Sequence, residues 1–505
     1  ARELKDRLET QKIISTSVGG EHFINDWTVE YDLSMSKAEE DEPDSVDAAV
    51  FEGDFSDLSY SSTRKPVISG ASDFYDASNY TLDEIERVKS YTTDEMTIVS
   101  LDLTRDMIVN DYPAMLKFGA KSSQREKDMD VDIRLYSGDD ISMADYTSGS
   151  VDYDLVNFGP SLSASKLRSA LNSLDEESDF VASYEEDYRI EEDINAAYFM
   201  GRIDMDELQI IAGVRYEATK TDSYGYAVDA DNETASRTHY SNSYSHALPA
   251  LLSKWEFAEN TQLRGAITHS VVRPNFEHMR PSYTYDGEEL VIGNPELKPM
   301  EARNFDLGIE HFVGEAGVVS AFGFYKDIDN FSYEVDGDEA DYGDFAQGLA
   351  ITTFKNGEKA TVKGLELAFS RKFTSLPAPF NGLLMAANYT RVQASAQSIQ
   401  GEYIRMQNLS DETGNVTLGY EDDRLNLRLA ANYKSDYDNG DGIVQDQTQL
   451  DFNASYKVTS QLDVRFKAAN LTNEVYYVYQ DSSNYNVQYE EYGPTYTLGV
   501  SYNSF

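Results

Sequence analysis

Tyrosine interleaved with acidic or amide residues recurs in several long polar stretches, and these residues are the best suited to hold a ligand. A tyrosine ring can stack on the C–H face of a sugar ring, while carboxylate and amide oxygens accept hydrogen bonds from neighbouring hydroxyl groups. The alternative is that the tyrosines lie at a membrane interface and the acidic residues only keep long loops soluble. The predicted ligand-binding residues are Tyr283, Tyr285, Asp286, Tyr333, Asp336, Tyr342, Tyr477, Tyr479, Asn484 and Tyr485.

An acidic run superficially resembles a calcium-binding loop. It offers the carboxylates of Asp436, Asp438 and Asp441 at short spacing. An EF-hand loop, however, requires glycine at its sixth position and glutamate at its twelfth. Counted from Asp436, those positions hold Asp441 and Gln447. The sequence therefore predicts no cofactor, with these three carboxylates as weak candidates for a loop-bound calcium ion.

Other residue types give no sign of catalysis. The 6 histidines are scattered without metal-ligand spacing, and no nucleotide-binding loop or nucleophile motif occurs. Because the chain has no cysteine, it has neither a disulfide framework nor a thiol nucleophile. We predict that the protein is not an enzyme.

The charge balance restricts the partners. With 90 acidic and 42 basic side chains, the formal net charge is −48. Such a surface repels nucleic acid, and it would serve negatively charged ferric siderophores poorly. The composition therefore favours a neutral or cationic ligand.

Strict alternation of apolar and polar residues is the main structural signal. In 304–310, Phe305, Leu307 and Ile309 share one face of the strand, and polar residues or glycine share the other. The segment 208–219 alternates in the same way. One face of such a strand suits hydrocarbon and the other suits water. Since no run of eighteen apolar residues occurs, a helical membrane protein is excluded.

Short and long connections alternate between these segments. Short ones lie near 204–206, 258–260 and 421–423. Helical periodicity occurs only around 164–174, and about 17 strands can be counted, the first near 11–19. This pattern predicts an all-β, transmembrane antiparallel β-barrel with short periplasmic turns and long extracellular loops. The expected loops are roughly 37–96, 126–189, 220–241, 273–301, 329–359, 396–412, 435–448 and 473–492.

Several segments resemble the TonB-dependent outer-membrane receptors, in particular a subgroup common in Caulobacter, Xanthomonas and marine bacteria. The stretch 294–310, NPELKPMEARNFDLGIE, is similar to a family signature. The order and spacing of the other matching segments strengthen the resemblance. They are GGEHF with WTVEYDLS at 19–34, AAYFM with AGVRYE at 196–217, LPALL with SVVRPNF at 248–276, VKGLEL at 362–367 and NLTNEVY at 470–476.

The resemblance implies a barrel of about 22 strands closed by a plug. On that basis residues 1–505 are expected to be the C-terminal part of the barrel, without the plug and about five strands. In such receptors the periplasmic TonB–ExbB–ExbD complex acts on the plug and supplies the energy for uptake. The chain is thus expected to be integral to a Gram-negative outer membrane, in contact with its lipid.

The ligand implied by the subgroup and by the tyrosine and aspartate loops is an oligosaccharide or glycoside. A ferric siderophore or haem receptor is the nearest alternative. A passive porin and a barrel that binds partners at the cell surface are further alternatives.

Some segments depart from the family pattern or are expected to be structural. The chain ends in 502–505, YNSF, which places Phe505 out of phase with Tyr502 unless a bulge intervenes. Pro494 can begin a strand but removes one hydrogen-bond donor. The segments 273–276 and 294–299 are predicted to close the outer ends of neighbouring strands rather than to touch substrate.

Overall fold

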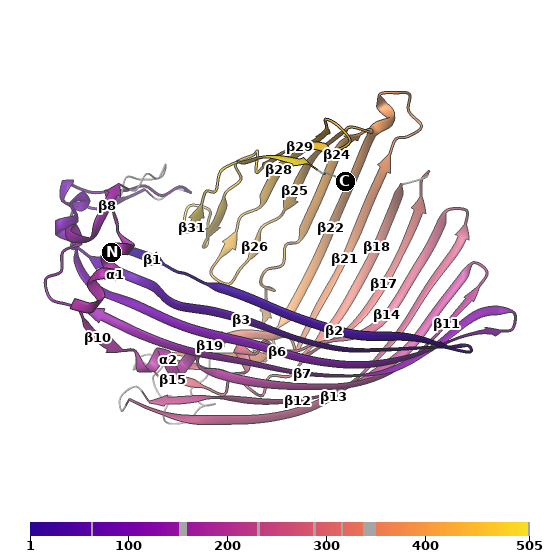
Figure 1. Cartoon of the computed structure of the whole chain (residues 1–505), viewed down its shortest axis with the longest axis horizontal. Helices are drawn as coiled ribbons and strands as arrows, with labels where there is room; N and C mark the ends of the chain where they lie inside the picture. The colour runs from indigo at the N-terminus through magenta and orange to yellow at the C-terminus, as the bar shows by residue number, and fades with distance from the viewer. Residues whose placement is uncertain are drawn as a thin grey trace.

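The computed structural model describes residues 1–61, 64–150, 159–229, 233–285, 289–314, 317–336 and 350–502. One large antiparallel sheet dominates these residues and curves into a trough (Figure 1). Neighbours along the chain are neighbours in the sheet, and the predicted number of about 17 strands is confirmed. The strands are β2 (Thr10–Ile24), β3 (Trp27–Glu52), β6 (Thr81–Val109), β7 (Tyr112–Ser137), β11 (Tyr188–Met205), β12 (Leu208–Asp229), β13 (Thr234–Ala258), β14 (Thr261–Val272), β17 (Met300–Phe312), β18 (Val318–Asp329), β21 (Lys359–Lys372), β22 (Leu383–Gln397), β24 (Glu412–Glu421), β25 (Leu425–Lys434), β28 (Gln447–Lys457), β29 (Leu462–Ala469) and β32 (Thr495–Tyr502).

The sheet does not close on itself within the described residues. There, β2 pairs with β3 and β32 pairs with β29, and the two outer edges stay apart (Figure 1). Among the same residues, no helix is long and apolar enough to cross a membrane.

The predicted alternation of faces is confirmed. On β17, Phe305, Leu307 and Ile309 are 42%, 60% and 42% exposed on the outside of the trough. On β12, Val214 and Tyr216 are exposed in the same way. These strands therefore carry an outward apolar band, while their polar residues face the interior.

Short turns join the strands at one end of the sheet. Asn110 and Asp111 connect β6 to β7 with positive φ angles of 49° and 72°. Asn and Asp tolerate this left-handed conformation, which two-residue hairpin turns require. Asp206 and Asn260 also have positive φ in the turns after β11 and β13.

The early strands are much longer than predicted. β3 has 26 residues and β6 has 29, and they pair from Trp27 and Arg105 to Glu52 and Thr81. The expected loop 37–96 is therefore wrong over most of its length. The two ends of the expected loops 126–189 and 220–241 also belong to strands. Crossing a membrane needs only about 10 residues per strand. The strands extend well past the apolar band on the side of the long connections.

Short elements lie before the first wall strand (β1) and in the long connections, including the predicted helical segment around 164–174. They are β1 (Arg2–Asp6), β4 (Ser59–Tyr60), β5 (Ile68–Ser69), η1 (Ser72–Tyr75), η2 (Ala77–Asn79), η3 (Met143–Tyr146), β8 (Thr147–Ser150), β9 (Pro160–Leu162), α1 (Ala164–Ala170), η4 (Leu171–Ser173), β10 (Asp175–Ser178), α2 (Phe180–Glu186), η5 (Glu277–Met279), β15 (Tyr283–Tyr285), β16 (Glu289–Ile292), β19 (Ser332–Asp336), β20 (Ala350–Asn356), η7 (Phe380–Gly382, in a short turn), β23 (Tyr403–Ile404), β26 (Tyr437–Asp438), β27 (Ile443–Val444), β30 (Tyr476–Tyr479) and β31 (Asn486–Glu490).

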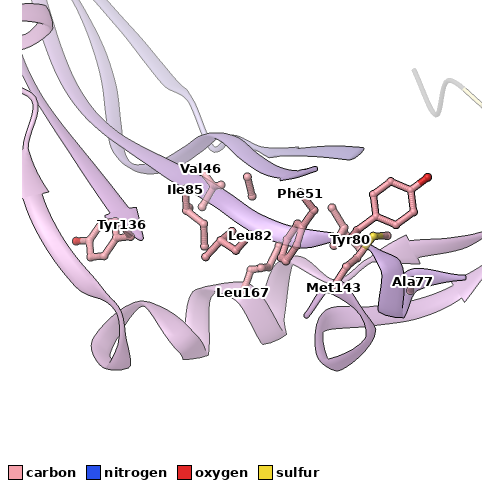
Figure 2. Packing of buried hydrophobic residues seen from close by; sticks show 11 residues of the cluster. Val46, Phe51, Ala77, Tyr80, Leu82, Ile85, Tyr136, Met143 and Leu167 are labelled. Atoms are coloured by element: carbon pink, nitrogen blue, oxygen red, sulfur yellow. The ribbon is translucent and has the colours of Figure 1, made fainter. Parts of the chain in front are cut away.

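The largest apolar cluster, which we call the cap core, lies where β3 and β6 end at the long connections (Figure 2). Phe51 and Ile85 come from these strands and are fully buried. Leu167 of α1 packs against them, and Tyr80 and Met143 come from the two adjoining connections. This core holds the first two long connections, 53–80 and 138–187, against the ends of the strands.

A second apolar cluster joins the connection after β14 to the wall. Phe276 and Leu297 are buried against Tyr188 and Ile190 of β11. The Asn294 amide donates to the carbonyl of Phe354 at 2.7 Å. These contacts support the predicted structural role of 273–276 and 294–299. Pro494 directly precedes β32, and residues 503–505 lie outside the described residues.

Asp187 sits where α2 leads into β11. Its Oδ1 accepts a hydrogen bond from the backbone N–H of Val131 at 2.8 Å. Burial raises the pKa of the Asp187 carboxyl to about 6. The folded chain thus binds this proton more tightly than the unfolded chain, and stability is lost as the pH rises through 6.

Asp187→Asn is expected to stabilise the protein at pH 8, because the amide oxygen keeps the acceptor and no charge is buried. The gain should be about 1 kcal/mol, since the group is only half-buried, and should vanish near pH 4. Thermal melting of the purified variant and the unchanged protein between pH 4 and pH 8 measures this gain in stability. Exposed Asp139→Asn is the control, and a gain of equal size at every pH contradicts the expectation.

Candidate ligand-binding site

The last two long connections fold into a small sheet of their own. β26, β27, β30 and β31 form this 4-stranded antiparallel sheet, which we call the roof sheet. Val444, Tyr477 and Val478 form its core and are fully buried. The predicted loops 435–448 and 473–492 are therefore ordered by packing.

A cavity of about 940 Å³ lies between the roof sheet and the inner face of the barrel wall. Its lining is mainly uncharged and polar, and three of its side chains carry charge: Lys434, Glu474 and Glu490. The uncharged polar residues that line it are Thr413, Asn415, Asn432, Tyr433, Gln447, Gln449, Asn470, Tyr476, Gln488, Tyr492 and Thr495.

Strand register explains why so many carboxamides meet here. Asn388, Asn415, Asn432 and Gln449 are directly opposite one another on β22, β24, β25 and β28, and we call them the carboxamide row. The Asn415 amide donates to Asn388 Oδ1 at 2.8 Å. Because side chains alternate along strands, all four face the interior while Val416 and Leu429 face outward.

Lys434 is the last residue of β25, beyond the outward apolar residues of that strand. Burial lowers the pKa of its ammonium group. The Nζ lies 3.6 Å from the centre of the Tyr437 ring, a cation–π contact. The cation in the cavity lining is thus already partnered by an aromatic ring.

Four predicted ligand-binding residues lie together on the β30–β31 hairpin, but none of them lines this cavity. Tyr477 is 0% exposed and its hydroxyl donates to the carbonyl of Ser483 at 2.7 Å. The Tyr477 ring is thus engaged in packing, and its role as a ligand contact stays a prediction. Tyr479 is partly buried, and Asn484 and Tyr485 lie at the exposed tip. Tyr476, one residue earlier, faces the cavity instead.

The other predicted tyrosines and acids lie on different connections. Tyr333 stacks on Phe331 with ring centres 5.3 Å apart, and its hydroxyl accepts a hydrogen bond from the Ile399 backbone. The ring is thus engaged in packing. Tyr283 and Tyr285 lie on β15 and Asp336 ends β19; β16 and β20 connect these two strands. Asp286 and Tyr342 lie outside the described residues. The assignment of each residue named in this paragraph as a ligand contact remains a prediction.

The three candidate calcium ligands do not converge. The Asp436 carboxylate lies 3.7 Å from the Arg405 guanidinium. Oδ1 of Asp438 accepts a hydrogen bond from the Gly440 backbone at 2.9 Å. In the part of the chain that the structure describes, no group of three acidic or histidine side chains could hold a metal ion. Loop-bound calcium stays a prediction for which these residues offer no formed site.

A contact between distant parts of the sequence fastens the roof sheet. Lys65, from the connection 53–80, lies with its Nζ 2.9 Å from the Glu491 carboxylate. The Arg64 guanidinium lies over the Tyr477 ring, 5.3 Å from its centre. The Asn486 amide donates to the Arg64 carbonyl at 3.1 Å. This contact, which we call the clasp, links the first long connection to the last.

The clasp predicts a specific cross-link. The chain has no cysteine, so Lys65→Cys with Glu491→Cys gives two reactive thiols in this sequence. A short bismaleimide should join them, and protease fragments from the two ends should stay together on a denaturing gel. Lys65→Cys with Gln461→Cys, at a short turn, is the control. Separate fragments from the first pair would contradict the clasp.

The comparisons with known proteins agree on one family. The family model described as "TonB dependent receptor-like, beta-barrel" matches residues 24–471. The chain is 23% identical over 322 residues to the haemoglobin-haptoglobin utilization protein B of Neisseria meningitidis serogroup A, covering 57% of this chain and 38% of that protein. It is 24% identical over 274 residues to the iron-regulated outer membrane virulence protein of Vibrio cholerae, covering 52% of this chain and 40% of that protein.

Solved structures show the same fold. The siderophore receptor PiuA from Acinetobacter baumannii matches with a TM-score of 0.62 at 14% identity, over 98% of this chain and 65% of that one. The closed form of the ferric-catecholate import receptor Fiu from E. coli K12 matches with a TM-score of 0.66 at 14% identity, over 98% of this chain and 64% of that one. The chain thus spans 38–40% of these curated relatives and less than two thirds of these structures.

Proposed function

Because this chain belongs to the TonB-dependent receptors, as an integral protein of a Gram-negative outer membrane, we propose that it serves the uptake of an iron complex. The family consists of receptors and transporters, so the chain is not an enzyme. The proposed cargo is a ferric siderophore or haem. The printed names of the relatives support iron acquisition better than the carbohydrate uptake expected from the tyrosine and aspartate loops.

The observation that carries this proposal within the chain is the cavity under the roof sheet. It faces the barrel interior at the end of the long connections, where a ligand from outside would arrive. Its volume of about 940 Å³ falls in the range of small-molecule sites. The outer end of the barrel thus offers a preformed space for a compact complex.

We further propose that the chain acts as the C-terminal barrel portion of a longer receptor. The match to 98% of this chain but only 65% of PiuA supports this arrangement. The TonB–ExbB–ExbD complex would then supply energy through the plug of the intact protein. Contact with lipid follows from the outward apolar band.

Oligosaccharide or glycoside uptake is the second candidate. It is favoured by the carboxamides and tyrosines of the cavity, since both can bind sugar hydroxyls. A passive pore and a surface-binding barrel differ from both candidates, because such a pore or barrel would work without an energy supply.

Whole-cell uptake distinguishes these functions. A deletion strain and its complemented parent would be given ⁵⁵Fe complexes and ¹⁴C-labelled oligosaccharides, each with and without a protonophore, and again in a strain lacking TonB. Iron uptake should fall in the deletion strain, with protonophore and without TonB. Loss of oligosaccharide uptake alone would favour the second candidate, and energy-independent uptake would indicate a passive pore.

A further inference from the structure

We infer that the cavity under the roof sheet selects an uncharged ligand whose surface carries hydroxyl or amide groups, with the carboxamide row as its specificity-determining surface. The transport of that ligand rests on the proposed function above, but its binding does not.

The carboxamide row provides both donors and acceptors without charge. Each Asn or Gln carries an N–H₂ donor and a carbonyl acceptor. Asn415, Asn432 and Gln449 all line the cavity, on three adjacent strands. Gln449 already donates to Asp451 Oδ1 at 2.9 Å, which leaves its carbonyl oxygen to accept from a ligand. Such a surface matches hydroxyl and amide groups in either hydrogen-bonding role.

The roof contributes rings and more amides from the opposite side. Tyr476 and Tyr492 line the cavity together with Gln488. Aromatic rings pack against the apolar surface of a ligand while their hydroxyls remain available for hydrogen bonds. A ligand between wall and roof thus meets polar, uncharged groups on both sides.

The charged groups in the lining give no advantage to an anion. Glu474 and Glu490 outnumber Lys434, whose ammonium lies on the Tyr437 ring. Glu490 is engaged by hydrogen bonds from Gln488 and Tyr492. The net charge of −48 adds long-range repulsion. An anionic ligand would have to approach a site whose lining holds two carboxylates and one ammonium group, which already lies on an aromatic ring.

This charge rule separates the classes of iron complex. A ferric ion held by three singly charged hydroxamate groups is uncharged overall, whereas three doubly charged catecholate groups leave a strongly anionic complex. Uncharged hydroxamate-type complexes therefore fit the cavity best. A neutral oligosaccharide shares the same hydrogen-bonding chemistry and must be distinguished by experiment.

Equilibrium binding to the purified full-length receptor tests the inference. The probes are ferrichrome, an uncharged ferric trihydroxamate; ferric enterobactin, an anionic ferric tricatecholate; and maltohexaose, a neutral oligosaccharide. We expect an uncharged probe to bind at least about 10-fold more tightly than ferric enterobactin. The Asn432→Leu and Gln449→Met variants, which keep side-chain size, should each weaken that binding by about 10-fold or more, because each loses hydrogen bonds to the ligand.

The matched control is Asn426→Leu. Asn426 lies on the same strand and the same inner face as Asn432, at the short-turn end and outside the cavity lining. The Asn426→Leu variant should bind the ligand with the same affinity as the unchanged protein. A heat-modifiable band on a gel confirms that each variant is folded.

The outcomes separate the inference from the proposed function. Tighter binding of ferric enterobactin, or unchanged affinity in both row variants, would overturn the inference and leave iron uptake intact. Row-dependent binding of maltohexaose but not ferrichrome would support the inference and contradict the proposed iron cargo.

Discussion

Replacing Arg273 with alanine is expected to lower the free energy of unfolding by about 3–5 kcal/mol, because it removes the ion-pair partner of buried Glu192 and leaves buried Glu217 with Arg215 alone. The guanidinium donates to Glu217 Oε2 at 2.8 Å and to Thr219 Oγ1 at 2.9 Å. Its Nε lies 3.6 Å from Glu192 Oε2. Glu192 and Glu217 are only 7% and 9% exposed, so water cannot replace the lost cation.

The loss should depend on pH. Glu192 lies on β11 beyond the apolar band, between the outward polar residues Glu191 and Asp193, and burial raises its pKa. A carboxyl with a raised pKa favours the folded state at low pH, and that contribution is lost as the pH rises. Without Arg273 the carboxylates repel each other more strongly above neutrality. The deficit of Arg273→Ala should therefore be larger at pH 8 than at pH 5, measured as the shift of the urea midpoint.

Arg189→Ala is the matched control. Arg189 makes ion pairs with Glu126 and Glu191 at 2.9 Å and 2.7 Å, but on the exposed outer surface. Exposed ion pairs contribute about 0–1 kcal/mol. Equal losses in the two variants would show that the Arg273 cluster is solvated rather than buried.

Phe51→Ala is expected to release the first two long connections from the strand ends. Phe51 is fully buried in the cap core beside Tyr80, Leu82 and Leu167 (Figure 2). Removing a buried phenylalanine side chain costs about 3–5 kcal/mol. Because the core joins connections rather than membrane-spanning segments, the barrel should remain folded while residues 53–80 and 138–187 open.

Proteinase K treatment of intact cells, followed by mass spectrometry of the fragments, detects this opening. Cleavage within both connections should increase, and the cross-link between positions 65 and 491 should form in lower yield. Phe380→Ala is the control, because Phe380 is 56% exposed at a short turn. An unchanged cleavage pattern in Phe51→Ala would mean that the cap core does not hold the connections.

Periodicity alone was sufficient to predict the membrane part of the fold. The exposed Val214 and Tyr216 of β12 lie on the face that alternation assigned to hydrocarbon. The outer strand parts were missed for a physical reason: past the apolar band, both strand faces become polar. In β3, the outward Lys37 and Glu39 form ion pairs with each other and with neighbouring strands. The residue composition of this part of the strand therefore resembles that of a soluble loop.

The ligand cavity was only partly predictable. Alternation along 425–433 puts Asn432 on the polar face of its strand, but the sequence does not show that Asn415 and Gln449 lie opposite it. That juxtaposition depends on the register between strands, which a single sequence does not encode locally. The sequence analysis named Tyr477, whereas Tyr476 lines the cavity, because one residue along a strand reverses the face.

Ferric ion quenches nearby fluorophores, so its position in the bound complex can be located directly. A fluorophore on the Tyr492→Cys variant would report from the cavity, because Tyr492 lines it and is 76% exposed. A fluorophore on the Ser245→Cys variant, on the outer face of β13, is the reference. We expect ferrichrome to quench the cavity label saturably, with half-saturation at the binding constant, and to leave the reference label unquenched. Saturable binding without quenching of the cavity label, or equal quenching of both labels, would contradict the placement of an uncharged iron complex in the cavity under the roof sheet.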